Sequence, residues 1–211
     1  MNKLILCFAL SLFLFCGKSN AQMTSEQITE KYGIKDEWSI EDNGSLSFCR
    51  IIMAKDTTLS QSEMFDKVMA YFNYNYTNGK NVIQSSDKES GYIIGKGLFV
   101  ISDAAGLNNS VEHLIKVDFK NGRARIIITV DSYLEYGSLY PGGWGETYEK
   151  NVVITSTYPF VKFNQRTEKL TKTEKIHNDF FEKLIKITEM SFDEIESTIN
   201  VGSSVFDSKE W

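Results

Sequence analysis

The sequence is poor in the residues that build disulfide scaffolds and metal sites. Its 211 residues include only three cysteines and two histidines. His113 and His177 have no second ligand at metal-binding spacing, and the chain has neither a His-Glu-x-x-His nor a Cys-x-x-Cys motif. A Gly-x-Ser-x-Gly elbow, which would start a serine triad, is also missing. We therefore expect no metal and no cofactor, and no residue can be assigned a catalytic role by motif.

Long hydrophobic runs are missing as well, except for one at the N-terminus. Lys3 precedes an apolar run over residues 4–15, and small and polar residues ending in Ala21 follow it. This pattern is typical of a secretory signal peptide, and the run is too short to span a membrane. The sequence therefore predicts that residues 1–21 are a signal peptide and that the chain is exported, periplasmic or secreted, without a transmembrane span.

A second interpretation of the N-terminus stays open. Cys16 and Gly17 follow the apolar run, as a lipid-anchored cysteine would. Bulky Leu14 and Phe15 precede this cysteine where small residues are usual, so cleavage after Ala21 fits the sequence better.

Removal of residues 1–21 changes the cysteine count and the charge. It would leave 190 residues, and 21 basic residues against 28 acidic ones give a net charge of −7 instead of −5. Cys49 would be the one remaining cysteine, so the exported chain would have no internal disulfide. A nucleic-acid surface needs a strong positive field, and we therefore expect no nucleic-acid partner.

The remaining chain alternates between strand-forming and helix-forming segments. We predict a lead-in without an element of its own at 22–43, one α+β domain at 44–200 and a C-terminal tail at 201–211. Capping boxes at Ser60–Glu63 and Thr171–Glu174 predict two amphipathic helices, and a third at Ser191–Glu194 predicts a kink or a new helix. β-forming residues predict strands at 46–54, 82–86, 92–101, 111–120 and 123–133, with a short strand or return segment at 152–155.

Two glycine-containing segments refine this prediction. Asn121-Gly122 lies between two β-rich runs and predicts a two-residue hairpin turn. Counting outward from the turn places Lys120 opposite Arg123 and Asp118 opposite Arg125 on one face of the sheet. Gly95 and Gly97 in the third strand predict a bulge or the close approach of another backbone.

The order of elements and three segments resemble a known family. The segments are Ser60–Phe72 after a short strand, Ser90–Gly97, and the hairpin Val117–Thr129. They resemble exported bacterial proteins of the Bacteroidetes type whose domain, of unknown function, has a TATA-binding-protein-like fold. The resemblance implies a five-stranded antiparallel sheet (β-α-β-β-β-β-α) in the order 1-5-4-3-2 with two helices on one face. It implies no catalytic residues.

Two surfaces are candidates for binding. A glycine-rich loop at 135–150 carries Tyr136, Tyr140, Trp144 and Tyr148, whose rings either stack on sugars, anchor a protein partner or cover the sheet. The sheet face away from the helices is predicted to be solvated, covered by that loop or shared with a second subunit. The residues expected on this open face are Lys116, Asp118, Arg125, Ile127 and Thr129.

These observations favour binding over catalysis. We expect an exported cell-envelope protein that acts as a non-catalytic binding or interaction module for a protein or glycan ligand. A homodimer through the open face or an edge strand is a further expectation. The alternative is an uncharacterised envelope hydrolase that uses carboxylates, because the separation of paired acids is set in three dimensions.

Overall fold

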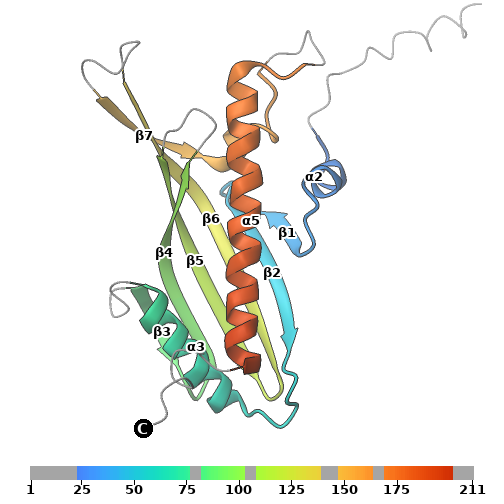
Figure 1. Cartoon of the computed structure of the whole chain (residues 1–211), viewed down its shortest axis with the longest axis vertical. Helices are drawn as coiled ribbons and strands as arrows, with labels where there is room; N and C mark the ends of the chain where they lie inside the picture. The colour runs from blue at the N-terminus through green and yellow to red at the C-terminus, as the bar shows by residue number, and fades with distance from the viewer. Residues whose placement is uncertain (1–22, 77–81, 103–107, 139–146, 164–168, 202–211) are drawn as a thin grey trace, which may run out of the picture.

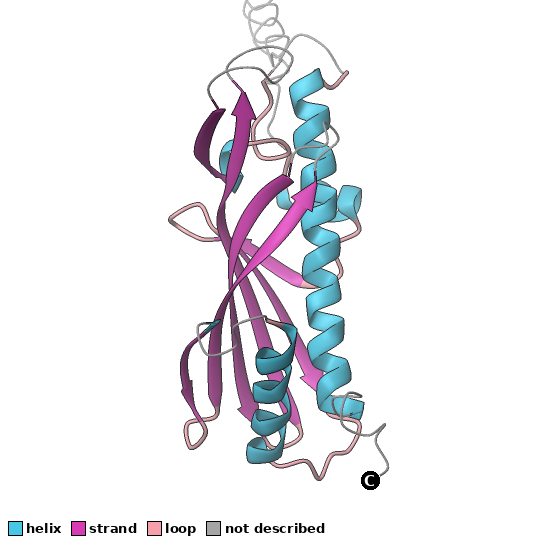
Figure 2. Ribbon diagram, turned by 60° about the vertical axis from the view of Figure 1, so that its left-hand side comes forward, coloured by secondary structure: helices cyan, strands magenta, loops and turns pink. Residues whose placement is uncertain are grey.

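The structure is a computed structural model and describes residues 23–76, 82–102, 108–138, 147–163 and 169–201. Its fold is an antiparallel sheet with helices packed on one face (Figures 1 and 2). The helical elements are α2 (Ser25–Tyr32), α3 (Gln61–Asn75), the short 3₁₀ helix η1 (Ile154–Ser156) and α5 (Lys172–Val201). The strands are β1 (Glu37–Ile40), β2 (Leu46–Met53), β3 (Ile83–Asp87), β4 (Tyr92–Ser102), β5 (Asn108–Lys120), β6 (Arg123–Ser138) and β7 (Thr147–Val153).

The sheet contains the five strands of the predicted order and two more, β1 and β7. The short strand or return segment predicted at 152–155 divides between the end of β7 and η1. The order of the sheet is β1-β2-β6-β5-β4-β3, with β7 paired to β6. The predicted order 1-5-4-3-2 corresponds to β2-β6-β5-β4-β3 and is confirmed. β2 pairs with β6 as far as Val130, and β7 pairs with Ser132–Ser138 of the same strand. Within the described residues the sheet therefore has seven strands instead of five, and the α+β class holds.

Two helix starts form as the capping boxes predicted. Ser60 Oγ accepts the backbone N–H of Glu63, whose carboxylate accepts the N–H of Ser60, so α3 begins at Gln61. Thr171 and Glu174 make the same reciprocal pair at the start of α5. Each pair satisfies backbone donors that a helix start leaves without a partner.

The new helix that was one of the two possibilities predicted at Ser191–Glu194 does not form. α5 runs without interruption from Lys172 to Val201, and Ser191 lies in its interior. Its hydroxyl donates to the carbonyl of Ile187, one turn earlier, at 2.9 Å. Because the hydroxyl bonds back along the helix, it does not cap a new one.

The segment 22–43 is also more structured than predicted. It contains α2, which begins with a Thr24–Gln27 capping box, and β1, which pairs with β2. Trp38 Nε1 donates to Thr29 Oγ1 at 2.8 Å and so joins the two elements. Neither element is evident from the sequence, because each is short, with a single buried residue in α2 and none in β1.

The core lies between the sheet and the two long helices. Alternate residues of the strands point into it and meet apolar side chains of α3 and α5. The largest fully buried side chains include Phe48, Phe72, Phe160, Phe181 and Phe192. In the part of the chain that the structure describes, no helix is both long and apolar enough to cross a membrane.

Gly95 and Gly97 lie in an uninterrupted β4–β5 register. The predicted irregularity does occur at Gly95, but in the partner strand: the register of β3 shifts between Ile83 and Ser85, which pair with Gly95 and Ile94. A close approach does occur, but it involves aromatic side chains and not backbone. A Cβ on Gly95 would lie 2.5 Å from Phe72, and one on Gly97 would lie 2.5 Å from His113. These glycines leave room for rings of the core.

A candidate binding face on the open side of the sheet

The hairpin register places the predicted charged residues on one open face. The structure pairs Lys120 with Arg123, Asp118 with Arg125 and Lys116 with Ile127, as the turn predicted. Their neighbours along β5 and β6, such as Val117 and Ile126, are buried on the opposite face. Figure 2 shows the two long helices, α3 and α5, on that opposite side of the sheet. No helix among the described residues covers the open face.

Asp118 holds two cations near the hairpin end of this face. Its carboxylate accepts from Arg125 Nη2 at 2.6 Å and pairs with Lys116 Nζ at 3.1 Å. Partial burial alone would raise the pKa of Asp118, but the hydrogen bonds from Arg125 and Lys116 outweigh it and lower that pKa. The carboxylate therefore stays ionised at neutral pH and fixes the two cationic side chains.

Two further cations lie beside this group and have no counter-ion in the described part of the chain. Lys120 and Arg123 face each other across the last pair before the turn, and both are exposed. Neither has an ion-pair partner among the described residues. Like charges directly opposite each other destabilise a hairpin. With Lys116, Arg125 and the single Asp118, they give this end of the face a local charge of about +3, counted from side-chain types.

Exposed apolar side chains lie next to these cations. On β2, Ile51 pairs with Arg125 and Met53 pairs with Arg123. Ile51 is 64% exposed and Met53 is 65% exposed. A shallow concavity of about 230 Å³ lies here and is lined by Ile51, Asp118, Lys120, Arg123, Ala124 and Arg125. We call Ile51, Met53, Lys116, Asp118, Lys120, Arg123 and Arg125 the basic–apolar patch.

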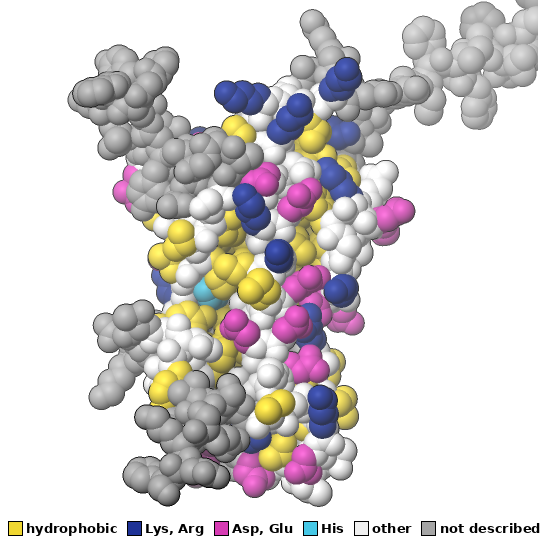
Figure 3. Space-filling model, viewed as in Figure 1, with side chains coloured by type: hydrophobic (Ala, Val, Ile, Leu, Met, Phe, Trp, Pro, Cys, Tyr) yellow, Lys and Arg dark blue, Asp and Glu magenta, His cyan; other side chains and the backbone are white. Residues whose placement is uncertain are grey.

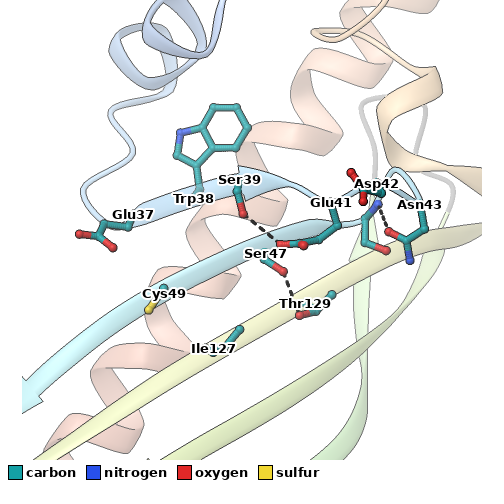
Figure 4. Close-up of a pocket in the computed structure, with 11 residues that line it drawn as sticks. Glu37, Trp38, Ser39, Glu41, Asp42, Asn43, Ser47, Cys49, Ile127 and Thr129 are labelled. Atoms are coloured by element: carbon teal, nitrogen blue, oxygen red, sulfur yellow. Dashed lines mark hydrogen bonds between the residues drawn. The ribbon is translucent and has the colours of Figure 1, made fainter.

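Ile127 and Thr129 lie farther along the same face, beside an open depression next to β1 (Figure 4). Thr129 Oγ1 bonds Ser47 Oγ at 3.2 Å, and Cys49 lies opposite Ile127. Burial raises the pKa of the Cys49 thiol, which disfavours the reactive thiolate. All five residues predicted for the open face are therefore on it, but they divide between the patch and this depression.

The depression also tests the carboxylate alternative. Glu37, Glu41 and Asp42 line it, but Figure 4 shows Glu37 directed away from the other two. Glu41 accepts a hydrogen bond from Ser39 at 3.0 Å. These carboxylates lie along an open rim and do not converge on one enclosed point, so no arrangement here favours paired-acid hydrolysis.

The aromatic segment 135–150 is not one long loop. β6 continues to Ser138 and β7 begins at Thr147, so Tyr136 pairs with Glu149 and Tyr148 pairs with Gly137. Tyr140 and Trp144 lie outside the described residues. Gly137 lies within β6, so a glycine in this segment does not mark a loop there.

The helix-covered side of the molecule has a different charge pattern. Figure 3 shows acidic and basic side chains interspersed along the exposed surface of α5. Ile51 and Met53 could not be assigned to a face from the sequence, because they lie in the apolar run Ile51–Ala54. The β2–β6 register places them on the open face.

One comparison with a solved structure agrees with the fold. A TBP-like protein from Parabacteroides distasonis ATCC 8503 has a TM-score of 0.51 at 13% identity, over 76% of this chain and 96% of that one. A DUF4468 family protein from Bacteroides ovatus ATCC 8483 has a TM-score of 0.49 at 16% identity, over 80% and 94%. No curated protein matches the chain. Residues 48–133 match the family model described as "Domain of unknown function (DUF4468) with TBP-like fold", which confirms the family resemblance that the sequence indicated.

Proposed function

We propose that the chain is an exported cell-envelope protein and a non-catalytic binding module, and that the basic–apolar patch binds an acidic, partly apolar segment of a protein partner. The observation that supports this most is the unneutralised Lys120–Arg123 pair beside exposed Ile51 and Met53. A chain with a net charge of −5 carries here a local excess of cations. Carboxylates of a partner would neutralise them while aliphatic groups cover the two apolar side chains.

A labelled ten-residue peptide of alternating glutamate and leucine is a suitable probe for this patch. Fluorescence anisotropy should show binding to the full chain that weakens as salt rises, because the charges are exposed. The double variant Lys120→Glu with Arg123→Glu should weaken binding at least tenfold. A double variant with the same charge change on α5, Lys175→Glu with Lys186→Glu, should leave it within about twofold, since both lysines are exposed on the other side. Equal losses in the two variants would show that only net charge matters and would overturn the assignment.

Export rests on the signal-peptide pattern and has its own test. Mass spectrometry of the protein recovered from envelope fractions of its bacterial host should give a chain that begins at Gln22. A diacylated or triacylated chain that begins at Cys16 would establish the lipid-anchored form instead. An uncleaved chain in the cytosol would contradict export.

A further inference from the structure

Four aliphatic side chains form a diagonal band across the open face of the sheet. In each step from β4 to β2, the next side chain lies on the neighbouring strand, two residues from the direct partner of the one before. Such diagonal neighbours are about 7–8 Å apart, within reach of long side chains. Leu114 is 38% exposed, Leu98 is 51% exposed and Ile51 is 64% exposed. We call this band the apolar diagonal, and its residues are Leu98, Leu114, Ile127 and Ile51.

The cations of β4, β5 and β6 on this face all lie on one side of the apolar diagonal, towards the hairpin turn. Within these three strands, Asp118 is the only carboxylate on that side. The local charge there is about +4, counted from side-chain types. The basic side of the face comprises Lys96, Lys116, Lys120, Arg123 and Arg125.

Carboxylates lie on the other side of the apolar diagonal. Residues 37–49, which include β1 and the first half of β2, contain no lysine or arginine. Three of their carboxylates surround the depression in Figure 4. In the described part of the chain, Glu112 is the only member of this side with an ion-pair partner, Lys96 at 2.9 Å. The acidic side comprises Glu37, Glu41, Asp42, Glu112 and Asp131.

The open face therefore changes the sign of its charge across the apolar diagonal, and this makes it complementary to itself. A half-turn about an in-plane axis along the diagonal places the diagonal of a second copy over that of the first. The same half-turn places the basic side of each copy over the acidic side of the other. We propose that two copies of the chain pack their open faces together in this way. Packed sheets lie about 10 Å apart, so the aliphatic side chains of the two copies interdigitate, and the contact closes as a symmetric dimer.

The position of the axis determines which residues meet. We take strands about 4.8 Å apart and alternate residues about 6.8 Å apart along each strand. Leu114 lies on the axis and faces Leu114 of the second copy. Glu37 lies in the same row of paired residues as Cys49 and falls over Lys120 and Arg123 of the second copy. The cations that lack a counter-ion in the described part of their own chain therefore meet a carboxylate.

A second copy fits this face better than other occupants do. An in-plane axis at right angles to the apolar diagonal would place cations over cations and carboxylates over carboxylates, which disfavours that arrangement. An acidic peptide would neutralise the basic side and leave the acidic side uncovered. The inference rests on the proposed function in one respect, that the cations of the basic–apolar patch recognise carboxylates, and it names a partner that supplies them.

Charge reversal on each side tests the pairing. Sedimentation equilibrium of the full chain should show a monomer–dimer equilibrium below about 1 mM. The double variant Lys120→Glu with Arg123→Glu should weaken the dimer by about tenfold or more, and so should Glu37→Lys, because like charges then face each other. An equimolar mixture of these two variants should dimerise about as tightly as the wild type, since each reversed charge meets its opposite in the mixed dimer.

Glu30→Lys on α2 is the matched control for Glu37→Lys. It makes the same charge change on the helix-covered side, where α2 contacts α5, and should leave the dimer within about twofold. Glu37→Lys also separates this inference from the proposed function, because it should lose the dimer and still bind the acidic peptide. A chain that binds the peptide but stays monomeric at about 1 mM would overturn the dimer and keep the patch. Rescue by the mixture without any peptide binding would support the dimer and reject the peptide ligand.

The axis has its own test at Leu114. Leu114→Lys and Leu114→Glu should each weaken the dimer, because a residue on the axis faces the same residue of the second copy. Their equimolar mixture should restore it, because lysine then faces glutamate. Rescue in neither mixture would overturn the proposal, and rescue at Glu37 without rescue at Leu114 would overturn the axis along the diagonal. Circular dichroism of each variant checks that it folds, and rescue in a mixture itself requires two folded chains.

Discussion

Gly97 lies so close to His113 that a Cβ at this position would be 2.5 Å from Nε2 of the imidazole. The same atom would be 2.6 Å from Tyr76 Cε1. Tyr76 and His113 are hydrogen-bonded at 3.2 Å, and Phe99 stacks on the imidazole with 3.6 Å between ring centroids. The lack of a side chain at position 97 is therefore what allows the end of α3 to pack on β4 and β5.

We predict that Gly97→Ala destabilises the fold. The added methyl group would push against rings that are themselves packed, and we expect a loss of about 1–3 kcal/mol. Urea unfolding followed by circular dichroism measures the change. Lys96→Ala on the exposed face is the control and should cost at most about 1 kcal/mol, because its ion pair with Glu112 is solvent-exposed. A Gly97→Ala variant with the same free energy of unfolding as the wild type would show that the aromatic cluster has room to move.

The stability should depend on pH through His113. Burial lowers the pKa of its imidazole to about 4, from 6.5 in the unfolded chain. The unfolded state therefore binds more protons between these values, and stability is lost as the pH falls from about 6.5 towards 4. Protonation of His113 should lower the free energy of unfolding by about 2–3 kcal/mol between pH 7.5 and 4.5. The total loss over this pH range should therefore be smaller by about 2–3 kcal/mol in His113→Gln than in the wild type. An NMR titration that places the imidazole pKa near 6.5 would contradict this.

Arg50 connects β2 to two other parts of the chain. Its guanidinium donates to both carboxylate oxygens of Asp36, at 2.6 and 2.8 Å, and to Asp193 of α5 at 2.6 Å. The Asp36 side chain is 9% exposed, so Arg50→Ala leaves a nearly buried carboxylate without its counter-ion. We predict a loss of about 2–4 kcal/mol in the free energy of unfolding. The double variant Arg50→Ala with Asp36→Asn should recover part of this lost free energy, because it removes the unpaired charge. A double variant that is less stable than Arg50→Ala alone would refute the charge-based explanation.

The predicted role of Trp144 as a ligand-binding aromatic is tested by removing its side chain. If the ring is presented to a ligand, Trp144→Ala should abolish binding on a glycan array while leaving the circular dichroism spectrum and urea midpoint unchanged. If the ring covers the sheet instead, the variant should unfold at lower urea, because burial of an aromatic side chain contributes several kcal/mol. The two outcomes separate presentation from packing.

The parts of the fold that the sequence predicted are those specified by local signals. The Asn121-Gly122 turn sets the hairpin register residue by residue, and Ser60 and Thr171 mark helix starts through side-chain hydrogen bonds. The wrong predictions depend on distant partners. Ser191 resembles a cap until its position inside α5 is known, and β1 is a strand only because β2 lies beside it. The positions of the basic residues of the patch could be predicted by counting outward from the turn. The positions of its apolar residues could not, because they depend on the pairing of β2 with β6.

The Lys120–Arg123 pair gives a prediction in which stability and binding change in opposite directions. Lys120→Glu replaces a like-charge pair directly opposite on adjacent strands with an attractive one. We expect the urea midpoint to rise, with a gain of about 0.3–1 kcal/mol that shrinks in high salt. The same change should weaken binding of the acidic peptide, because it removes a cation from the patch. Lys120→Gln should fall between the wild type and Lys120→Glu in both measurements. If Lys120→Glu lowers both stability and binding, the lysine has a structural partner, and its loss then accounts for the weaker binding.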